Sequence, residues 1–403
     1  MGSIGVGDGL KGQVDANGNP LTTLSIAAKN DVVFAAGVAS NKSGNTQIIS
    51  EKGDVKFNTI NTGNEVRAIG DGNNYYTDGQ TQDNGSNVTS FGNLTVAGNN
   101  VTGVATTLNS QTGTTSIYAD NDVTFTEGRA TTDFSTASKM SSSGFLSKRT
   151  SQERFNSESD TAISSNIEGN QVAIQAGNNI SLTGTNAISD KGTSLTAGGD
   201  IDVLAAQNTS SESTYSQTKK SGLFGADGGM GFTIGKQQTD ESNTSTSLTH
   251  TASNVGAIDG NVIITAGGKY QQTGSNLIAG MGADSDKDIN STERGNTVVR
   301  AKQINIDNAL DVYTNQSEQT FKQSGLTVSV SNSLIDSAQS IDALVDAGGN
   351  TQSVRMKGMA GAAGLLKVKA LAAEANSAGY DLLDGNLKGV GNTRIQATIG
   401  TQK

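Results

Sequence analysis

The chain has 403 residues, of which 51 are Gly, one is Pro, one is His and none is Cys or Trp. Hydrophobic residues make up 33% and charged residues only 16%, so that Asn, Ser, Thr and Gln supply most of the polar surface. This composition leaves almost no material for a zinc site, a cysteine nucleophile, a disulfide framework or a histidine-based triad. The net charge of −10 argues against nucleic acid and anionic lipids as partners.

The N-terminal residues Met1-Gly2-Ser3 resemble an expression scar, and we assign residues 1–24 to an N-terminal edge. They lack the basic and apolar stretches of a signal peptide, and no apolar run of about 18 residues predicts a transmembrane helix. The chain stops within an apparent strand, which indicates a segment of something longer. The absence of Cys suits a secreted protein, because stray thiols would crosslink it in an oxidising compartment.

A short phrase recurs from residue 26 onward: apolar, x, Ala, x, Gly or Asn, Asp or Asn, apolar, x, apolar. Six of its Asp and Asn residues, taken as markers, follow one another at steps of 23, 46, 22, 57 and 21. The short steps share one period, and 46 is twice 23. The positions that we predict to be structural corners are Asp31, Asp54, Gly98, Asn100, Asp122, Gly177, Asn179, Gly198, Asp200 and Gly267.

A repeat of about 22 residues, with alternating apolar positions on either side of a corner, predicts a right-handed parallel β-helix. Each rung would pair with its neighbours at ~4.8 Å and stack its inward side chains into a narrow core. We expect Gly and Asn to supply positive φ at the corner, Asp to cap it, and Asn and Thr to form ladders outside the core. A Gly-rich β-sandwich is the alternative, but it does not explain the common register.

Three larger repeats open with Gly-Asn at 92, 169 and 260 and then leave the rung period for excursions rich in Ser, Thr and Gln. Their alternating pattern predicts long strands or hairpins that project from or flank the helix. The predicted order is β-helix rungs at 25–128, an excursion at 129–168, rungs at 169–207, a hairpin-like excursion at 208–259, and rungs with an excursion at 260–330.

The period becomes helical near the C-terminus, which predicts a helical insertion at 331–388 and a resumed strand at 389–403. The second helical stretch, about 356–378, is rich in Ala and carries few charges. Either contact with a membrane or packing against the β-helix explains it. The residues that would make the membrane contact are Met359, Leu365, Leu366 and Leu371.

Three candidate sites are each better explained without chemistry. Asp284, Asp286 and Asp288 resemble the start of a calcium loop, but Ile289 and Gly295 stand where Gly and Glu are required. The corner aspartates could stack into the carboxylate row of a polysaccharide-cleaving β-helix, yet capping a turn is the ordinary reason for Asp there. His250 is interpreted as a surface residue of a strand. We therefore predict no catalytic, cofactor-binding or metal-binding residue, and no enzyme.

Two phrases carry a resemblance to a known family: Gly-Asn-x-x-Ile-x-Ala-Gly-x-Asp-Ile, and Ser-Gly-Leu-Phe-Gly followed by Gly-Phe-Thr-Ile-Gly-Lys-Gln at 231–237. They resemble the haemagglutinin repeats of filamentous haemagglutinins and of the exoproteins of contact-dependent growth inhibition. The resemblance covers residues 25–400 and is strongest at 169–282. It implies secretion through an outer-membrane partner transporter and display at the bacterial cell surface as a filament. It further implies passage into the outer membrane or periplasm of a target cell while a toxin is delivered.

Two functional hypotheses follow from the sequence. The first is a structural and delivery module whose rungs stack on the rest of its own filament. The second is an adhesin whose Ser/Thr/Asn-rich excursions bind a receptor or a glycan. A polysaccharide-active β-helix is a minor third alternative.

Overall fold

The computed structural model describes residues 2–144, 146–225, 229–280, 295–331 and 394–402. Within these ranges the secondary structure consists of β-strands, without a helix. The chain forms two compact units. The first unit comprises Met1–Ala137, Arg154–Thr214 and Asn243–Gln316, and the second comprises Ser138–Glu153, Tyr215–Ser242 and Ser317–Lys403.

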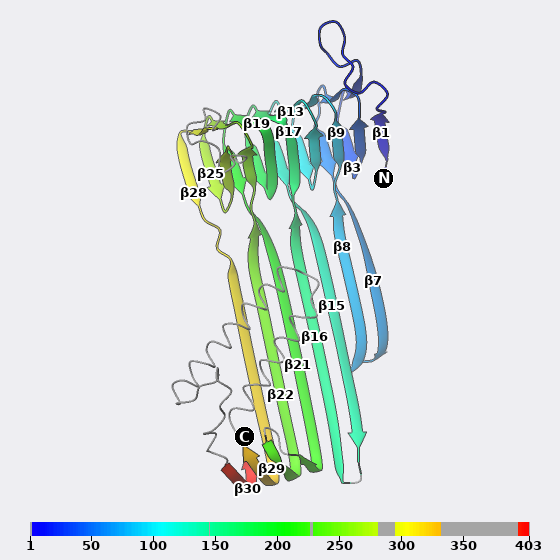
Figure 1. The fold of residues 1–403 in the computed structure, drawn as a ribbon, viewed down its shortest axis with the longest axis vertical. Helices are drawn as coiled ribbons and strands as arrows, with labels where there is room; N and C mark the ends of the chain where they lie inside the picture. The colour runs from blue at the N-terminus through cyan, green and yellow to red at the C-terminus, as the bar shows by residue number, and fades with distance from the viewer. Residues whose placement is uncertain (1, 145, 226–228, 281–294, 332–393, 403) are drawn as a thin grey trace, which may run out of the picture. The chain divides into compact units, whose positions relative to one another are not determined.

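In the first unit the chain winds through stacked rungs of three short strands each, which confirms the parallel β-helix (Figure 1). The first strands of successive rungs are β2 (Thr23–Ala28), β5 (Asn45–Ser50), β10 (Leu94–Gly98), β13 (Thr114–Ala119), β17 (Ser165–Ala176), β19 (Thr185–Ala197), β24 (Asn261–Ala266) and β27 (Thr297–Arg300). The second strands are β3 (Val32–Ala35), β6 (Val55–Asn58), β11 (Val101–Val104), β14 (Val123–Thr126), β18 (Ile180–Thr183), β20 (Ile201–Leu204), β25 (Lys269–Thr273) and β28 (Gln303–Asp307).

The third strands complete the rungs and form one 14-stranded sheet with the first strands. They are β4 (Val38–Asn41), β9 (Asn87–Ser90), β12 (Thr107–Ser110), β23 (Asn254–Ala257) and β26 (Asn276–Ala279), joined at the N-terminal edge by β1 (Ser3–Val6). The strands β17 and β19 each pass from the third position of one rung into the first position of the next. The pairings between rungs are parallel, and like residues of successive rungs lie opposite one another.

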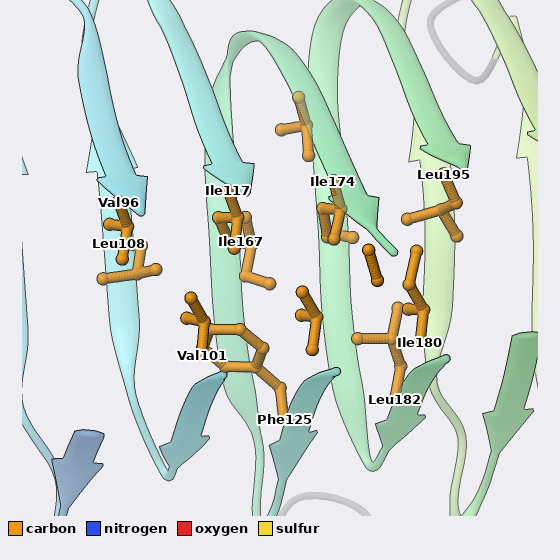
Figure 2. Close-up of a cluster of buried hydrophobic side chains, with 14 of the residues drawn as sticks. Val96, Val101, Leu108, Ile117, Phe125, Ile167, Ile174, Ile180, Leu182 and Leu195 are labelled. Carbon is orange, nitrogen blue, oxygen red and sulfur yellow. The ribbon is translucent and has the colours of Figure 1, made fainter. Parts of the chain in front are cut away.

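The core consists of inward columns of mostly aliphatic side chains, with an occasional aromatic one such as Phe125, as Figure 2 shows. In the column of the first strands, Ile117 lies between Val96 and Ile174, and all three side chains are buried. In the column of the second strands, Tyr270 pairs with Ile201 and is also fully buried. Since full burial of one such side chain contributes about 1.5–3 kcal/mol, these columns supply the main driving force for the fold.

In the described part of the chain, three alternate rungs insert a hairpin between their second and third strands. The hairpin strands are β7 (Ile60–Asp71) with β8 (Asn74–Asn84), β15 (Gly128–Ser143) with β16 (Ser147–Ile163), and β21 (Ala206–Gly225) with β22 (Gly229–Thr251). After the last described rung, β29 (Val312–Ser331) pairs antiparallel with β30 (Arg394–Gln402). All these strands form one eight-stranded sheet in the order β30-β29-β22-β21-β16-β15-β8-β7. A hairpin adds two strands for every two rungs, so the hairpin sheet contains one strand per rung. The distance between its strands therefore equals the distance between rungs.

The hairpin β7–β8 changes the interpretation of the repeat spacing. The marker step of 46 residues equals two short periods in the sequence, but in the structure it is a single rung that carries this hairpin. The step of 57 is likewise one rung plus β15–β16. The helical insertion predicted at 331–388 lies outside the described ranges, except for its first residue, Ser331.

Candidate functional site: corners and hairpins of the repeat

The predicted corner residues lie in one column, here called the corner ladder, at the turn between the first and second strands. Asn100 illustrates its geometry: its backbone N–H and its Nδ2 donate to Asp54 Oδ1 at 3.2 and 2.9 Å, and its own Oδ1 accepts from the N–H of Asp122 at 3.3 Å. The remaining backbone contacts run from Asp54 N to Asp31 Oδ1 (3.0 Å), from Asn179 N to Asp122 Oδ1 (3.0 Å), from Asp200 N to Asn179 Oδ1 (2.8 Å) and from Lys269 N to Asp200 Oδ1 (2.7 Å).

Two carboxylates of the ladder, Asp31 and Asp54, are held in their ionised form. The Nζ of Lys56 lies 2.7 Å from Asp31 Oδ2 and 3.1 Å from Asp54 Oδ2. The hydrogen bond from Lys56 lowers the pKa of Asp31, and the hydrogen bond from the Asn100 side chain is the largest cause that lowers the pKa of Asp54. A general acid needs a raised pKa instead. The ladder therefore supports capping of the corner over glycosidic chemistry.

The expectation of positive φ at these corners is wrong. Gly98, Gly177, Gly198 and Gly267 all lie outside the left-handed region. What they provide is room for the next rung: a Cβ at Gly177 would overlap the carbonyl oxygen of Asp120, which belongs to the neighbouring rung. Gly198 and Gly267 meet the carbonyl oxygens of Gly177 and Gly198 in the same way. Glycine is thus required here by close backbone approach.

Positive φ occurs at the other corner, where the second strand turns into the third. In the four rungs without a hairpin, this turn is made by Ala36 (φ 49°), Ala105 (φ 47°), Gly184 (φ 55°) and Gly274 (φ 57°). In the hairpin-bearing rungs the chain leaves for the hairpin at the corresponding place. In one rung, a residue in the left-handed conformation therefore makes the short turn between the second and third strands. In the next rung, a hairpin connects these two strands instead.

Three buried serines, here called the return serines, stand where a hairpin rejoins its rung: Ser86, Ser165 and Ser253. The hydroxyl of Ser165 accepts from the backbone N–H of Thr106 in the preceding rung at 3.0 Å. It donates to the carbonyl of Thr126, the last residue of β14, at 2.7 Å. Ser253 repeats both contacts with the N–H of Thr185 (2.9 Å) and the carbonyl of Leu204 (2.6 Å). Ser86 does so with Gly37 and Asn58 at 3.3 and 3.4 Å.

Each return serine thus connects the two ends of a hairpin to each other and to the neighbouring rung. This role was not predicted from the sequence. The signal was present as Ser-Asn-apolar at 86–88, 165–167 and 253–255. The Asn of this phrase builds a second ladder, in which the side-chain amides of Asn186, Asn254 and Asn276 each donate to the preceding side chain at 2.7–2.9 Å, beginning from Asn166.

The hairpin strands also form a polar groove of about 620 Å³ within the first unit. Hydroxyl groups and the carboxylates of Asp133, Glu158 and Asp160 line it, with Val312 and Leu248 as its apolar residues. His250 lies elsewhere on β22, with its Nδ1 2.9 Å from Asp311 Oδ1. Such a surface can hydrogen-bond a polar ligand.

Other candidate sites from the sequence contribute little to this picture. The described residues contain no group of three or more His, Asp or Glu able to hold a metal ion. The acidic stretch at 284–288 and the proposed membrane-contact residues Met359, Leu365, Leu366 and Leu371 lie outside the described ranges. Within the described ranges, no helix has the length and hydrophobicity needed to span a membrane.

Comparison with known proteins agrees with this architecture. Residues 146–290 match the hemagglutinin repeat family. The chain is 36% identical over 222 residues to the tRNA nuclease CdiA of Escherichia coli strain STEC_O31, an alignment that covers 55% of this chain and 6% of the relative. It is 28% identical over 334 residues to the tRNA nuclease CdiA-2 of Burkholderia pseudomallei strain 1026b, covering 80% and 10%. No solved structure matches significantly.

The chain is also 36% identical over 192 residues to the 16S rRNA endonuclease CdiA of Enterobacter cloacae. This alignment covers 47% of this chain and 5% of that protein. The chain thus spans at most a tenth of the length of these relatives, whose names describe nuclease activities of the whole proteins. The matched repeat is a structural region. By its fold and by these matches, the chain is similar to the hemagglutinin-repeat proteins of the filamentous haemagglutinin and CdiA type.

Proposed function

We propose that this chain is a stalk and toxin-delivery segment of a large exoprotein that is secreted through an outer-membrane partner transporter and displayed at the bacterial cell surface. In this role it performs no catalysis. Its work is to stack on the remaining rungs of its own filament and to carry hairpins toward the outer membrane or a receptor of a target cell. The alternating rungs and hairpins are the observation that carries the proposal, because they combine a rigid repeat with a regular series of projecting strands.

The last described rung supports stacking on further rungs. Ile304 pairs with the buried Tyr270 and so continues an inward column, yet its side chain is 47% exposed. Ile306, two residues later, is 67% exposed. The strand β28 lies at the end of its sheet and offers backbone groups to another strand. Another rung placed there would bury both isoleucines and pair this edge.

The repeat architecture also fits export as an unfolded chain. Each rung contacts its neighbours, so that a new rung can add to the preceding one as it leaves the transporter. The ladders assist, because Asp122 and Asn179 join successive rungs although a hairpin separates them in the sequence. Folding outside the cell then proceeds in the order of secretion.

The test uses the whole exoprotein in a contact-dependent growth inhibition assay. One variant removes residues 94–171, two complete rungs with one hairpin, and joins Asn93 to Val172, because Val172 occupies the same rung position as Leu94. A second removes only residues 128–164 and joins Glu127, changed to Gly, to Ser165. This imitates the tight corner at Ala105. Surface display is measured by antibody labelling of intact cells, and folding by resistance to added protease.

The stalk role predicts that both variants are displayed and protease-resistant. The delivery role predicts that loss of the hairpin lowers inhibition of target cells at equal display. Full inhibition by the hairpin-deleted variant would refute the delivery role and leave a passive stalk. Failure of the two-rung deletion to reach the surface in folded form would refute the stalk role.

The second candidate function is an adhesin, favoured by the hydroxyl- and carboxylate-lined groove of the first unit. Its shape and hydrogen-bonding groups suit a glycan or another polar receptor. Calorimetric titration of surface glycans from neighbouring cells, with a Glu158→Ala variant as control, tests it. Saturable binding that the variant weakens supports the adhesin, and the absence of binding at millimolar glycan rejects it.

A further inference from the structure

A second groove, of about 450 Å³, lies within the second unit and is strongly basic. Five of its eleven lining residues are lysines: Lys148, Lys219, Lys220, Lys236 and Lys322. These come from β16, β21, β22 and β29, which are consecutive strands of the hairpin sheet. In a chain with a net charge of −10, such a concentration of positive charge on four neighbouring strands is a local reversal of the average.

Exposed apolar side chains accompany the lysines toward the turn end of each hairpin. Leu146, Leu223 and Ile234 are 61%, 43% and 52% exposed. In β22, Ile234 and Lys236 occupy positions of the same parity, which face the same side of a regular strand. Leu146 directly precedes β16, which carries Lys148, and Leu223 lies on β21 together with Lys219. The hairpins therefore carry apolar positions at their turn ends, followed by a band of lysines.

Carboxylates compensate the positive charge of this groove only in part. Among the residues that the structure places, no carboxylate forms an ion pair with Lys148, Lys219 or Lys236. Asp240 offsets part of this charge, because its carboxylate interacts electrostatically with Lys322 while its two oxygens accept hydrogen bonds of 2.6 Å from Gln217 and Gln238. Like charges on neighbouring strands repel each other, so anions bound in the groove would relieve this repulsion.

We propose that this lysine groove binds phosphate groups of an anionic lipid surface while the neighbouring apolar residues contact the acyl boundary. Lysine is a strong point-charge partner for phosphate, and an apolar band flanked by lysines is the usual composition of a surface that lies at a membrane interface. Nucleic acid fits less well, because none of the described lining residues offers an aromatic ring for base stacking. The inference rests on the proposed delivery role for its biological meaning, and it differs from the expectation that net charge disfavours anionic lipids.

The test is co-flotation of the 403-residue chain with vesicles of defined composition. Wild-type protein should float with vesicles that contain phosphatidylglycerol, remain behind with pure phosphatidylcholine vesicles, and be released by 0.5 M salt, ~3–5 times the physiological concentration. The groove variant carries Lys148→Gln, Lys219→Gln, Lys236→Gln and Lys322→Gln. Since each lysine near an anionic surface contributes about a fivefold factor, the partition coefficient of this fourfold variant should fall by roughly 600-fold.

The matched control replaces four exposed lysines of the first unit, Lys29, Lys42, Lys52 and Lys302, and so has the same net charge. It should float like the wild type, and circular dichroism should show that both variants are folded. Equal loss in the control would overturn the proposal in favour of a net-charge effect, as would undiminished flotation of the groove variant or equal binding to phosphatidylcholine.

Two further arms identify the source of the phosphate. Inorganic phosphate or pyrophosphate at matched ionic strength should displace the chain from the vesicles only weakly if the lipid surface is recognised. Groove-dependent binding of pyrophosphate without flotation would replace the lipid by a free anion and overturn the proposal, and groove-dependent binding of a single-stranded oligonucleotide without flotation would do the same. Because these assays use no target cell, their outcome is independent of whether the delivery role survives its own test.

Discussion

Asp122 Oδ1 accepts a hydrogen bond from the backbone N–H of Asn179 at 3.0 Å, although 57 residues separate the two along the chain. The intervening segment contains the long hairpin β15–β16 and the rest of one rung. The corner ladder therefore joins equivalent positions of adjacent rungs. Its contacts are the same whether or not a hairpin lengthens the chain between them. This explains how hairpins of different lengths can be inserted without loss of register.

The ladder itself can be tested by truncating one member. Asp122→Ala leaves the N–H and the Nδ2 of Asn179 without their acceptor, and we expect the free energy of unfolding to fall by about 1–2 kcal/mol. Asp122→Asn retains an acceptor oxygen and should cost less than half as much. Urea unfolding followed by circular dichroism measures both, with the exposed Asp190→Ala as control. An equal effect of Asp122→Ala and Asp190→Ala would show that the contact contributes nothing.

The ladder also predicts loss of stability in acid. The folded-state pKa values of Asp31 and Asp54 lie below the ordinary value of 3.8, mainly through hydrogen bonds from Lys56 and Asn100 respectively. A group whose pKa is lowered on folding stabilises the protein above its unfolded pKa, and this contribution is lost as the pH falls through the folded pKa. Unfolding midpoints should therefore be constant from about pH 6 to 5 and decline below about pH 4. Asp54→Asn should flatten that decline.

Close packing between rungs makes Gly177 intolerant of a side chain. Gly177→Ala would drive a Cβ into the carbonyl oxygen of Asp120, so that the two rungs must separate locally, and we expect a loss of about 2–4 kcal/mol. Gly72 lies in the turn of β7–β8 with open space around its Cβ position. Gly72→Ala should therefore stay within about 0.5 kcal/mol of the wild type. Thermal unfolding of the two variants side by side provides the comparison.

The second corner predicts opposite effects for two reciprocal substitutions. Ala105 holds a left-handed conformation that costs a non-glycine residue roughly 1–2 kcal/mol. Ala105→Gly should leave stability unchanged or raise it by up to about 1 kcal/mol, since the gain is partly offset by the entropy of Gly in the unfolded chain. Gly184→Ala should lower it by about 1–2 kcal/mol, because the new Cβ also meets Ala206 at 2.8 Å. Denaturation midpoints that move in the same direction for both would contradict this account.

The return serines are expected to stabilise the base of each hairpin. Ser165→Ala removes the acceptor for Thr106 N–H and the donor to Thr126, both within a buried corner. Leaving these groups unpaired should cost about 1–3 kcal/mol. The neighbouring, half-buried Ser164→Ala should cost much less. Hydrogen exchange at the base of β15–β16 should rise in the Ser165 variant, and unchanged exchange there would indicate that the serine does not hold the hairpin.

Much of the solenoid could be predicted from the sequence, because the determining interactions are local and repeat at a fixed spacing. The alternation of Val172, Ile174 and Ala176 indicates an inward face. The recurrence of the same phrase indicates that these faces stack. The excursions were visible as departures from that period. Period and alternation thus determine the rung, its core positions and its corner, since each arises from a few consecutive residues.

Tertiary structure alone decided the rest. No local pattern distinguishes a step of 46 residues that spans two rungs from one that spans a rung and a hairpin, and only pairing across rungs placed β7–β8. The reason for Gly177 was close approach of another rung, which depends on a carbonyl from outside its own repeat. The lysine groove likewise unites Lys148 and Lys322, which lie far apart in the sequence. Contacts between repeats depend on which strands become neighbours, and neighbours in space are not encoded by periodicity.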